Sequence, residues 1–472
     1  MSKKTDTVLM NTPFLGDENI REVYFIGIGG IGMSAVAKFF HSKGVVVSGY
    51  DKTPTSLTAG LEQLGIRIHY KEDLEQIPKH AQLVVYTPAV PKDHQELVFF
   101  QQQGSRVVKR SDVLQMISES SFNICVAGTH GKTTITTMVA HLLRDTGYGC
   151  NAFLGGISVN YGTNFWSDTN NVCVIEADEY DRSFLKLSPD IAIISAMDPD
   201  HLDIYGTAES VEQAFIDFSK KTKPGGLLIS QYGLKRGREL NASRRMTYSL
   251  QNDMADVYGT NIRMNDGSYE FDVMMPGNMI SNIQLHMGGM HNVENVIAAI
   301  AAASSLEIEN EKIKKAVASF RGVKRRFEYI VKTRELVYVD DYAHHPEELR
   351  ALINGAKTLF RQRKCTVIFQ PHLYSRTRDF ADGFAEVLDM ADEVVLLPIY
   401  PAREQSIEGV SSEMIIDKMK IKNKRTLAKA ELENWLAGFK SAIDKDFGNV
   451  LVTAGAGDID TLVEKIRDTL NR

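Results

Sequence analysis

A glycine-rich turn between an apolar run and a helical pattern limits the possible fold more than any other feature of this chain. The apolar residues 122–127 precede the turn, and apolar residues at helical spacing follow it over 138–143. Strand, glycine turn, Lys-Thr and helix together predict a phosphate-binding loop, because glycines let backbone N–H groups face the phosphates and the helix N-terminus adds positive charge. The predicted loop consists of Gly128, Thr129, His130, Gly131, Lys132, Thr133 and Thr134.

Two residues of this loop have specific expected roles. Lys132 would reach the outer phosphates of a nucleotide, and the Thr133 hydroxyl would bind Mg²⁺. Val126 replaces the first glycine of the longer phosphate-loop pattern, which argues against generic GTPases and motor ATPases. The alternative is an ordinary glycine-rich turn without a ligand.

The overall composition predicts a globular cytoplasmic enzyme. A length of 472 residues suggests about three domains, and the net charge of −6 gives no basic field that would attract nucleic acid or an anionic membrane. Residues 1–20 lack a signal-peptide pattern, and no apolar run is long enough to span a bilayer. The cysteines show no metal-type spacing, and Cys125, Cys173 and Cys365 lie in or beside strand-like runs, which favours buried thiols over disulfides.

Strand-like and helix-like runs alternate at both ends of the chain. Such alternation predicts α/β domains with parallel, doubly wound sheets. The expected N-terminal strands are 23–26, 45–47, 83–86 and 106–108, with a helix over 33–40. The expected C-terminal strands are 336–339, 366–369, 393–397 and 450–452, with a helix over 346–360. Between them, the phosphate loop is followed by a β-rich polar stretch near 241–285 and a helix over 291–305. We predict domains at 1–118, 119–326 and 327–472.

A second glycine loop lies near the N-terminus and satisfies the dinucleotide fingerprint. Gly27, Gly29 and Gly32 give the G-x-G-x-x-G pattern between a strand and a helix, and Asp51 follows Gly32 by 19 residues, near the offset of a ribose-binding acid. Alone, this motif favours an NAD-dependent oxidoreductase. A UDP-sugar carries the same diphosphate and hydroxyl groups, however, and an oxidoreductase has no use for a γ-phosphate site. The loop could also be a tight turn that binds nothing.

Acidic residues and a histidine follow two apolar runs of the middle block. Glu176 ends the run 172–175, and His201 follows the run 191–195. Ligands collect at the carboxyl ends of parallel strands, so both side chains can lie beside Lys132 and Thr133. Carboxylate and hydroxyl oxygens suit Mg²⁺, so we predict Thr133, Glu176 and His201 as metal-site residues, with His201 serving a second metal or the substrate. A solvated loop is the alternative.

Further candidates lie downstream. His291 and Asn295 share one face of the expected helix, and Asn292 could read an adenine edge. Arg326 follows two other basic residues where two domains meet, a suitable place to bind a transferring phosphoryl group. Arg376 follows another strand, where an arginine can bind a carboxylate. A helix cap and a solvated basic face are the simpler readings.

In this order, the motifs resemble those of the Mur ligase family over nearly the whole chain. The resemblance rests on residues 27–34, 86–91, 128–134, 176–179, 200–203, 291–295, 326–328, 341–346 and 371–379. It implies N- and C-terminal Rossmann-like parallel sheets flanking a central P-loop ATPase-type α/β domain. It also implies ATP and Mg²⁺ as cofactors, with Mn²⁺ as an alternative, and a monomer or weak homodimer.

The resemblance assigns roles to the candidates. The UDP-sugar would be bound by Gly27, Gly29, Gly30, Ile31, Gly32, Asp51, Thr87, Pro88 and Ala89. Together with the phosphate loop, ATP would be bound by His291, Asn292, Asn295, Arg326 and Asp341. The amino acid would be bound by Tyr342, His344 and Arg376. The expected catalytic residues are Lys132, Glu176, His201, Arg326 and Arg376.

The implied reaction joins L-alanine to the lactyl carboxylate of UDP-N-acetylmuramate through an acyl phosphate, in peptidoglycan precursor synthesis. One alternative is a recycling branch of the family that adds a tripeptide to the same sugar, and another is the oxidoreductase. Two departures matter. Leu373 stands where the family pattern has an arginine, and residues 213–215 read Gln-Ala-Phe where several relatives carry a carbamylated lysine. We therefore predict no such lysine here.

Overall fold

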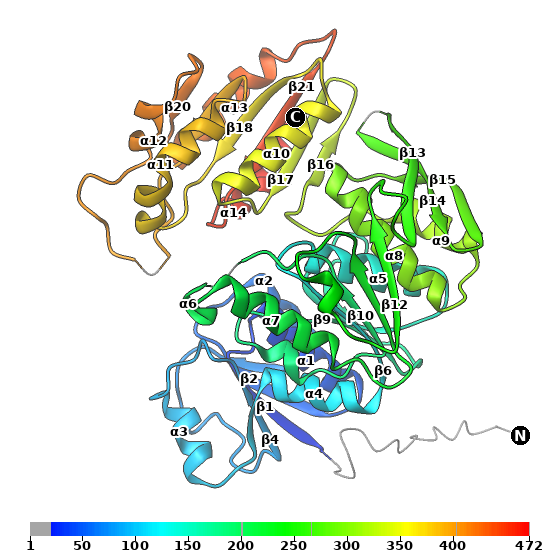
Figure 1. Cartoon of the computed structure of the whole chain (residues 1–472). Coiled ribbons are helices and arrows are strands. Elements are labelled where there is room, and N and C mark those ends of the chain that lie inside the picture. Colours follow the sequence, from blue (N-terminus) through cyan, green and yellow to red (C-terminus); the bar gives the residue numbers. More distant parts are fainter. Residues whose placement is uncertain (1–19, 200–201, 266, 403, 472) are drawn as a thin grey trace, which may run out of the picture. The chain divides into compact units, whose positions relative to one another are not determined.

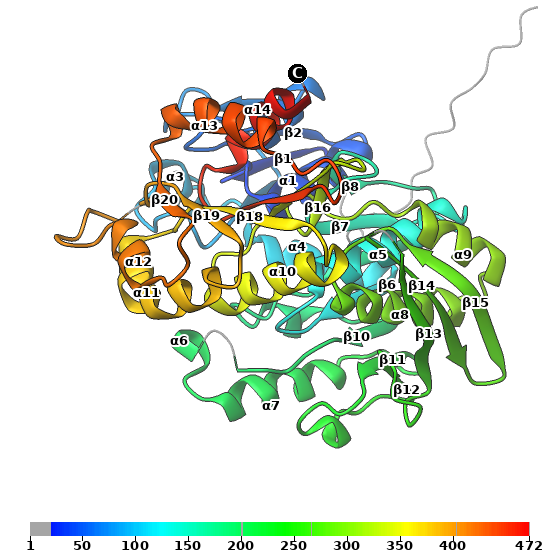
Figure 2. The same ribbon diagram turned by 90° about the horizontal axis from the view of Figure 1, so that it is seen from above.

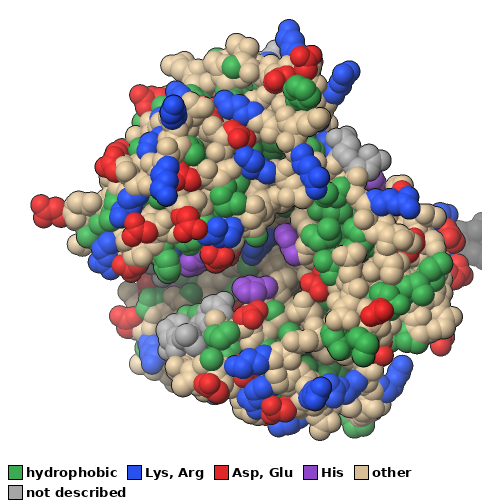
Figure 3. Space-filling model, turned by 45° about the horizontal axis from the view of Figure 1, so that its top comes forward, with side chains coloured by type: hydrophobic (Ala, Val, Ile, Leu, Met, Phe, Trp, Pro, Cys, Tyr) green, Lys and Arg blue, Asp and Glu red, His purple; other side chains and the backbone are tan. Residues whose placement is uncertain are grey.

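The computed structural model describes residues 20–199, 202–265, 267–402 and 404–471 (Figure 1). These residues form two compact units. The first unit comprises Met1–Gly156 and Thr163–Thr247, and the second comprises Ile157–Gly162 and Tyr248–Arg472. On the face seen in Figure 3, Lys and Arg side chains are interspersed with Asp and Glu, as expected for a chain of small net charge.

The first unit begins with a five-stranded parallel sheet in the order β3-β2-β1-β4-β5. Its strands are β1 (Glu22–Ile26), β2 (Val46–Tyr50), β3 (Arg67–His69), β4 (Leu83–Tyr86) and β5 (Val107–Lys109). Its helices are α1 (Ile31–Ser42), α2 (Ser56–Gln63), α3 (Gln95–Gln102) and α4 (Arg110–Ser120). Strand β1 is apolar at every inner position because both its faces are covered: Val23 and Phe25 pack in one core cluster, Tyr24 and Ile26 in the other.

The same unit contains a second sheet, which carries the phosphate loop. Within this unit the strand order is β11-β10-β6-β9-β7-β8. The strands are β6 (Phe122–Ala127), β7 (Asn151–Ser158), β8 (Thr163–Trp166), β9 (Val172–Glu176), β10 (Ile191–Ile194) and β11 (Leu227–Gln231). Helices α5 (Lys132–Asp145), α6 (Leu202–Tyr205) and α7 (Ala208–Ser219) and the 3₁₀ turns η1 (Ser183–Lys186) and η2 (Gly237–Glu239) belong to this part.

The second unit begins with antiparallel strands, which confirms the β-rich prediction for residues 241–285. β13 (Val257–Asn265), β14 (Ser268–Met275) and β15 (Asn278–Leu285) pair antiparallel, and β12 (Arg244–Ser249) pairs with β13 through Tyr248 and Ser249. Helices α8 (Met290–Ser305) and α9 (Asn310–Ser319) follow.

A six-stranded sheet completes the second unit, in the order β16-β17-β21-β18-β19-β20. Its strands are β16 (Glu328–Lys332), β17 (Leu336–Asp341), β18 (Lys364–Phe369), β19 (Glu393–Leu396), β20 (Lys424–Thr426) and β21 (Asn449–Ala454). Figure 2 shows α10 (Pro346–Leu359) and α11 (Tyr374–Leu388) on one face, and α13 (Leu432–Ser441) and α14 (Asp460–Asn471) on the other. Helix α12 (Glu413–Lys418) and the turn η3 (Lys429–Glu431) lie near β20.

The parallel sheets at both ends of the chain confirm the predicted α/β class. Two differences are informative. The short strands β3 and β20 read Arg-Ile-His and Lys-Arg-Thr, so they lack the apolar run by which a strand is recognised. Strand β16 pairs antiparallel with β17 at the edge of an otherwise parallel sheet, an arrangement that long-range pairing decides.

All four cysteines are buried and free, as the sequence predicts for three of them. Within the described ranges, no helix combines the length and the apolar character needed to cross a membrane.

Candidate active site

The phosphate loop lies between β6 and α5, as the sequence predicts. Gly128 has φ +140° and Gly131, the N-cap of α5, has φ +82°, values that L-residues with side chains rarely adopt. A Cβ on Gly128 would also collide with Ser195 at the end of β10. Both glycines are therefore required by the backbone, which turns the start of α5 towards the carboxyl edge of the sheet.

Lys132, the first residue of α5, projects back over this loop. Its Nζ donates hydrogen bonds to the carbonyl oxygen of Gly128 at 2.8 Å and to the carboxylate of Glu179 at 2.7 Å. The Glu179 side chain is 1% exposed. Burial raises the pKa of Glu179, and the neighbouring Lys132 charge opposes this shift.

Thr133 and Glu176 meet as predicted for a metal site. The Thr133 hydroxyl donates to Oε1 of Glu176 at 3.0 Å, and the Gly155 N–H donates to Oε2 at 3.0 Å. Burial raises the pKa of Glu176, while the nearby Lys132 charge lowers it. A hydroxyl and a carboxylate held side by side fit the oxygen preference of Mg²⁺.

The third predicted metal residue, His201, lies outside the described residues. Among the residues that are described, no group of three or more His, Cys, Asp or Glu side chains is arranged to hold a metal ion. A metal ion bound by Thr133 and Glu176 would therefore need further ligands from a phosphate, from water or from residues outside the described ranges.

The remaining loop residues make local contacts. Thr129 is buried, and its hydroxyl accepts the N–H of Asp198 at 3.2 Å. His130 is exposed, with its imidazole 3.9 Å from the Asp198 carboxylate. Thr134 is buried inside α5. The loop therefore contacts the residues that follow β10.

The structure also assembles the N-terminal glycine loop. Asp51, which follows β2, accepts the N–H of Gly29 at 2.7 Å. A Cβ on Gly27 would lie 2.7 Å from the Thr87 methyl group, so the glycine allows the turn after β4 to approach. Pro88 and Ala89 lie in that turn, which the Val90 N–H to Thr87 carbonyl hydrogen bond closes. Gly30 is the N-cap and Ile31 the first residue of α1. These predicted residues therefore come together at one edge of the first sheet.

The sequence analysis gave no individual role to Arg110 or to Glu179, although Glu179 lies in the family-like segment 176–179. Arg110 begins α4, and its guanidinium fills the space that a Cβ on Gly32 would need. Glu179 lies three residues beyond Glu176, shortly after the end of a strand. Its position near that strand end could have marked it as a second acid of the site. Arg110 gave no local signal, because α4 and the glycine loop are far apart in sequence.

In the second unit, the predicted adenine residues lie at the start of α8. His291 is exposed and Asn292 is buried. The Asn292 side-chain amide donates to the carbonyl oxygen of Gly288 at 2.6 Å, and the Asn295 amide donates to Asn292 at 3.1 Å. Asn292 thus holds the start of the helix, while the other two lie partly or fully exposed beside it.

Arg326 lies between two residues in left-handed conformation. Arg325 has φ +60° and Phe327 has φ +49°. The Phe327 N–H donates to Asp341 at 2.6 Å, and the Arg326 guanidinium lies 5.7 Å from the centre of the Tyr342 ring. Burial raises the pKa of Asp341 to about 6, although the Phe327 N–H and the Arg326 charge stabilise its ionised form and oppose this shift. Arg326, Asp341 and Tyr342 therefore lie close together, although the sequence assigns the first two to ATP and Tyr342 to the amino acid.

The predicted amino-acid residues come together from the ends of β17 and β18. The Tyr342 and His344 rings are 5.2 Å apart, and the His344 and His372 rings are 6.2 Å apart. Arg376 lies 3.3 Å from His372, between Nη1 and Nδ1. Leu373, which replaces the expected arginine, is the N-cap of α11 and has φ +70°.

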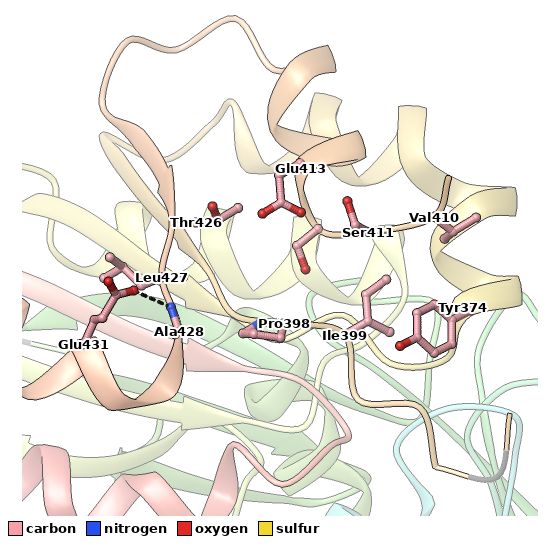
Figure 4. Close-up of a pocket in the computed structure, with 11 residues that line it drawn as sticks. Tyr374, Pro398, Ile399, Val410, Ser411, Glu413, Thr426, Leu427, Ala428 and Glu431 are labelled. Carbon is pink, nitrogen blue, oxygen red and sulfur yellow. Dashed lines mark hydrogen bonds between the residues drawn. The ribbon is translucent and has the colours of Figure 1, made fainter. Parts of the chain in front are cut away.

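A separate pocket of about 370 Å³ opens in the second unit beyond the ends of β19 and β20 (Figure 4). Ile399, Glu413, Thr426 and Glu431 line it together with Tyr374. Among the predicted site residues that the structure describes, none lines this pocket.

Comparison with known proteins gives one consistent family. The model of the "Mur ligase family, catalytic domain" matches residues 22–121, that of the "Mur ligase middle domain" matches 126–303, and that of the "Mur ligase, glutamate ligase domain" matches 325–457. Three matched regions support the predicted three-domain architecture. The boundaries at residues 118 and 326 stay predictions.

Curated relatives cover the chain nearly end to end. The UDP-N-acetylmuramate–L-alanine ligase of Phocaeicola vulgatus is 47% identical over 96% of this chain and 99% of the relative. The protein of the same name from Porphyromonas gingivalis is 46% identical over the same shares.

Solved structures agree with these relatives. The UDP-N-acetylmuramate-alanine ligase of Thermotoga maritima superposes with a TM-score of 0.79 at 30% identity, over 95% of this chain and 99% of that one. A murein peptide ligase from Psychrobacter arcticus has a TM-score of 0.64 at 22% identity, over 96% and 99%, and shares the fold.

Proposed function

Because the chain belongs to the Mur ligase family, we propose that it joins L-alanine to UDP-N-acetylmuramate in a reaction driven by ATP. The observation that carries this proposal is the full-length identity of 47% to a ligase with that name. The phosphate loop, with Lys132 and the Thr133–Glu176 pair at its mouth, supplies the chemistry that such an enzyme needs.

The reaction has two chemical steps. An oxygen of the lactyl carboxylate attacks the γ-phosphorus of ATP, and ADP leaves as the acyl phosphate forms. The amine nitrogen of L-alanine then attacks the acyl carbon, phosphate leaves, the nitrogen loses a proton and an amide remains. The first step brings an anion against a polyanion, so neutralising charge is the main requirement.

The phosphate loop meets part of this requirement. Backbone N–H groups at the start of α5 bind phosphate oxygens, and Lys132 moves its charge from Glu179 to the outer phosphates. Thr133 and Glu176 would hold Mg²⁺, which when bound neutralises phosphate charge. Gly155 keeps the Glu176 carboxylate beside the Thr133 hydroxyl, so this pair is oriented before a ligand arrives.

The other substrates bind at the remaining predicted residues. The N-terminal glycine loop with Asp51 and residues 87–89 binds the UDP-sugar, and Arg110 lies against that loop. His291, Asn295 and Asp341 bind the nucleotide, and Arg326 contacts the transferring phosphoryl group. Tyr342, His344 and Arg376 bind L-alanine; Arg376 takes its carboxylate, since Leu373 offers no charge.

Two alternatives are less supported. Two solved structures are 22% and 24% identical to this chain and show the fold alone: a murein peptide ligase and a UDP-N-acetylmuramate:L-alanyl-γ-D-glutamyl-meso-diaminopimelate ligase. An NAD-dependent oxidoreductase would leave the phosphate loop without a role. We also propose that the protein is a monomer or a weak homodimer, which light scattering across a range of concentrations would decide.

Phosphate release by the purified protein tests the function. The assay contains Mg-ATP and UDP-N-acetylmuramate, with and without L-alanine, and mass spectrometry identifies the product. We expect release that requires both substrates and a product heavier by one alanyl residue. Release with the tripeptide but not with L-alanine would favour the recycling branch, and release that needs neither substrate would overturn the proposal.

A further inference from the structure

Asn164, in β8, is a fully buried polar side chain whose hydrogen bonds all reach one helix. Its amide nitrogen donates to the carbonyl oxygen of Ile31 at 2.6 Å and to the Ser34 hydroxyl at 2.9 Å. Its amide oxygen accepts from Lys38 Nζ at 2.9 Å. Asn164 and Ser34 are both 0% exposed. Burying an amide is costly unless it is paired, so this set of contacts holds one specific geometry.

The helix that Asn164 holds is α1, whose first turn carries the predicted diphosphate loop. Ile31 is the first residue of α1, directly after the N-cap Gly30. Lys38 Nζ also donates to the Thr163 hydroxyl at 3.1 Å, so two neighbouring residues of β8 bind the same cation. Burial lowers the pKa of Lys38, as expected for an ammonium group enclosed in this contact.

Aromatic packing fixes the same contact. The ring of Phe39 on α1 lies 5.1 Å from Phe153 on β7 and 5.9 Å from Phe165 on β8. The Phe153 and Phe165 rings are 5.2 Å apart. Such aromatic pairs stabilise a contact beyond simple burial of area. We call residues Asn151–Gly156 of β7 and Thr163–Trp166 of β8 the β7–β8 edge.

The β7–β8 edge also touches the predicted metal site. Two residues after Phe153, the Gly155 N–H binds the Glu176 carboxylate, which in turn accepts the Thr133 hydroxyl. A Cβ on Gly155 would collide with that carboxylate, so only glycine allows the approach. The edge therefore contacts the sugar-diphosphate helix on one side and the metal ligand of the phosphate loop on the other.

We infer that the β7–β8 edge sets the position of the UDP-sugar loop relative to the phosphate loop, and that Asn164 is the positioning residue of this arrangement. Asn164 touches no substrate; it acts through α1. Its role is to bring the lactyl carboxylate to the γ-phosphate, so the inference rests on the proposed function. Misplacing reacting groups by about 1 Å can lower a rate roughly 100-fold without abolishing binding.

Asn164→Leu tests the inference, because leucine keeps the volume and removes all three hydrogen bonds. We expect kcat per folded molecule to fall roughly 10- to 100-fold. The dissociation constants for UDP alone and for ATP alone should change less than about threefold, since each loop is intact. Hydrogen exchange of the α1 backbone amides should become faster. A purely structural role would lower the melting temperature but leave kcat per folded molecule and the α1 exchange unchanged.

Asn170→Leu is the matched control. Asn170 follows β8, is partly buried, and its amide donates to the carbonyl oxygen of Tyr148 at 2.8 Å, away from α1. We expect this variant to keep kcat and α1 exchange within about twofold of the parent. If Asn164→Leu does not fold, Ser34→Ala replaces it, since it removes one of the three hydrogen bonds and should lower kcat severalfold.

The outcomes separate this inference from the function. Unchanged kcat in a folded Asn164→Leu variant, or equal effects in the Asn170 control, would overturn the positioning role. If the parent protein forms no alanyl product, the proposed function is wrong. Faster α1 exchange in Asn164→Leu would then still support the contact, and unchanged exchange would overturn it.

Discussion

The two glycine loops of the first unit follow the same local plan and differ in charge. Each follows a buried strand and precedes a helix with a glycine N-cap, Gly30 for α1 and Gly131 for α5. The first helical residue is Ile31 in one and Lys132 in the other. Gly30 has an ordinary φ of −63°, whereas Gly131 has φ +82°.

The surrounding carboxylates differ as well. In the N-terminal loop, Asp51 accepts a backbone N–H and so shapes the turn itself. In the phosphate loop, Glu176 and Glu179 bind the side chains of Thr133 and Lys132. A shared strand–glycine–helix pattern thus predicts an anion site in both places. The first helical residue and the acids on neighbouring strands decide which phosphate chemistry each supports.

Removing the lysine should have the largest effect. We expect Lys132→Ala to lower turnover roughly 10³-fold, because the outer phosphates lose their main side-chain cation. Phosphate-release kinetics measure this. UDP binding, followed by calorimetry, should stay unchanged because it uses the other loop; parallel loss of both would mean that the two loops do not act separately.

Neutralising the metal-site acid should come next. Glu176→Gln keeps the shape but removes the charge, so we expect turnover to fall about 100-fold. The Mg²⁺ concentration for half-maximal rate should rise. A titration of rate against Mg²⁺ checks this, and an unaltered titration curve would remove Glu176 from the metal site.

Asp51→Asn probes the N-terminal loop in the same way. The amide oxygen can still accept the Gly29 N–H, but hydrogen bonds to charged acceptors are stronger, so we expect about tenfold weaker UDP-sugar binding. The affinity for ATP should not change. Calorimetric titrations with each ligand give both numbers, and a comparable loss for ATP would contradict the division of roles.

Ile31→Lys asks whether the first helical residue is enough to convert one loop into the other. We expect no second ATP to bind, because the N-terminal loop has no counterpart of the Thr133–Glu176 pair. Equilibrium dialysis with labelled ATP would count the sites. A second ATP bound per chain would show that the lysine alone converts the N-terminal loop into an ATP site.

The smallest expected effect is on stability against pH. Burial raises the pKa of Glu179 above its ordinary 4.5, so the folded state holds this proton more tightly than the unfolded chain. The resulting stabilisation is present below pH 4.5 and is lost as the pH rises through the folded-state pKa. The free energy of unfolding, measured with urea from pH 4 to 7, should therefore decrease less in Glu179→Gln than in the parent. Identical pH profiles would mean that Lys132 fully compensates the burial.

Local patterns determined much of the fold and part of the site. Apolar runs and glycine turns located the phosphate loop, the N-terminal loop and the α8 helix within a few residues, because these depend on neighbours in the chain. The pairing of Asp51 with the glycine loop and of Glu176 with Thr133 was also foreseeable, since acids that follow parallel strands meet at one edge. Neither the antiparallel edge strand β16 nor the three-residue strands β3 and β20 carried such a signal.

The sequence by itself thus determined which residue types stand at strand ends and helix starts, and therefore which anions the loops can bind. Only the tertiary structure decided that Glu179 pairs with Lys132, that Arg110 packs against Gly32 and that Asn164 is hydrogen-bonded to α1. The physical reason is the distance along the chain. Arg110 and Asn164 act on residues 78 and 133 positions away, and such contacts depend on how whole sheets and helices pack rather than on any local pattern.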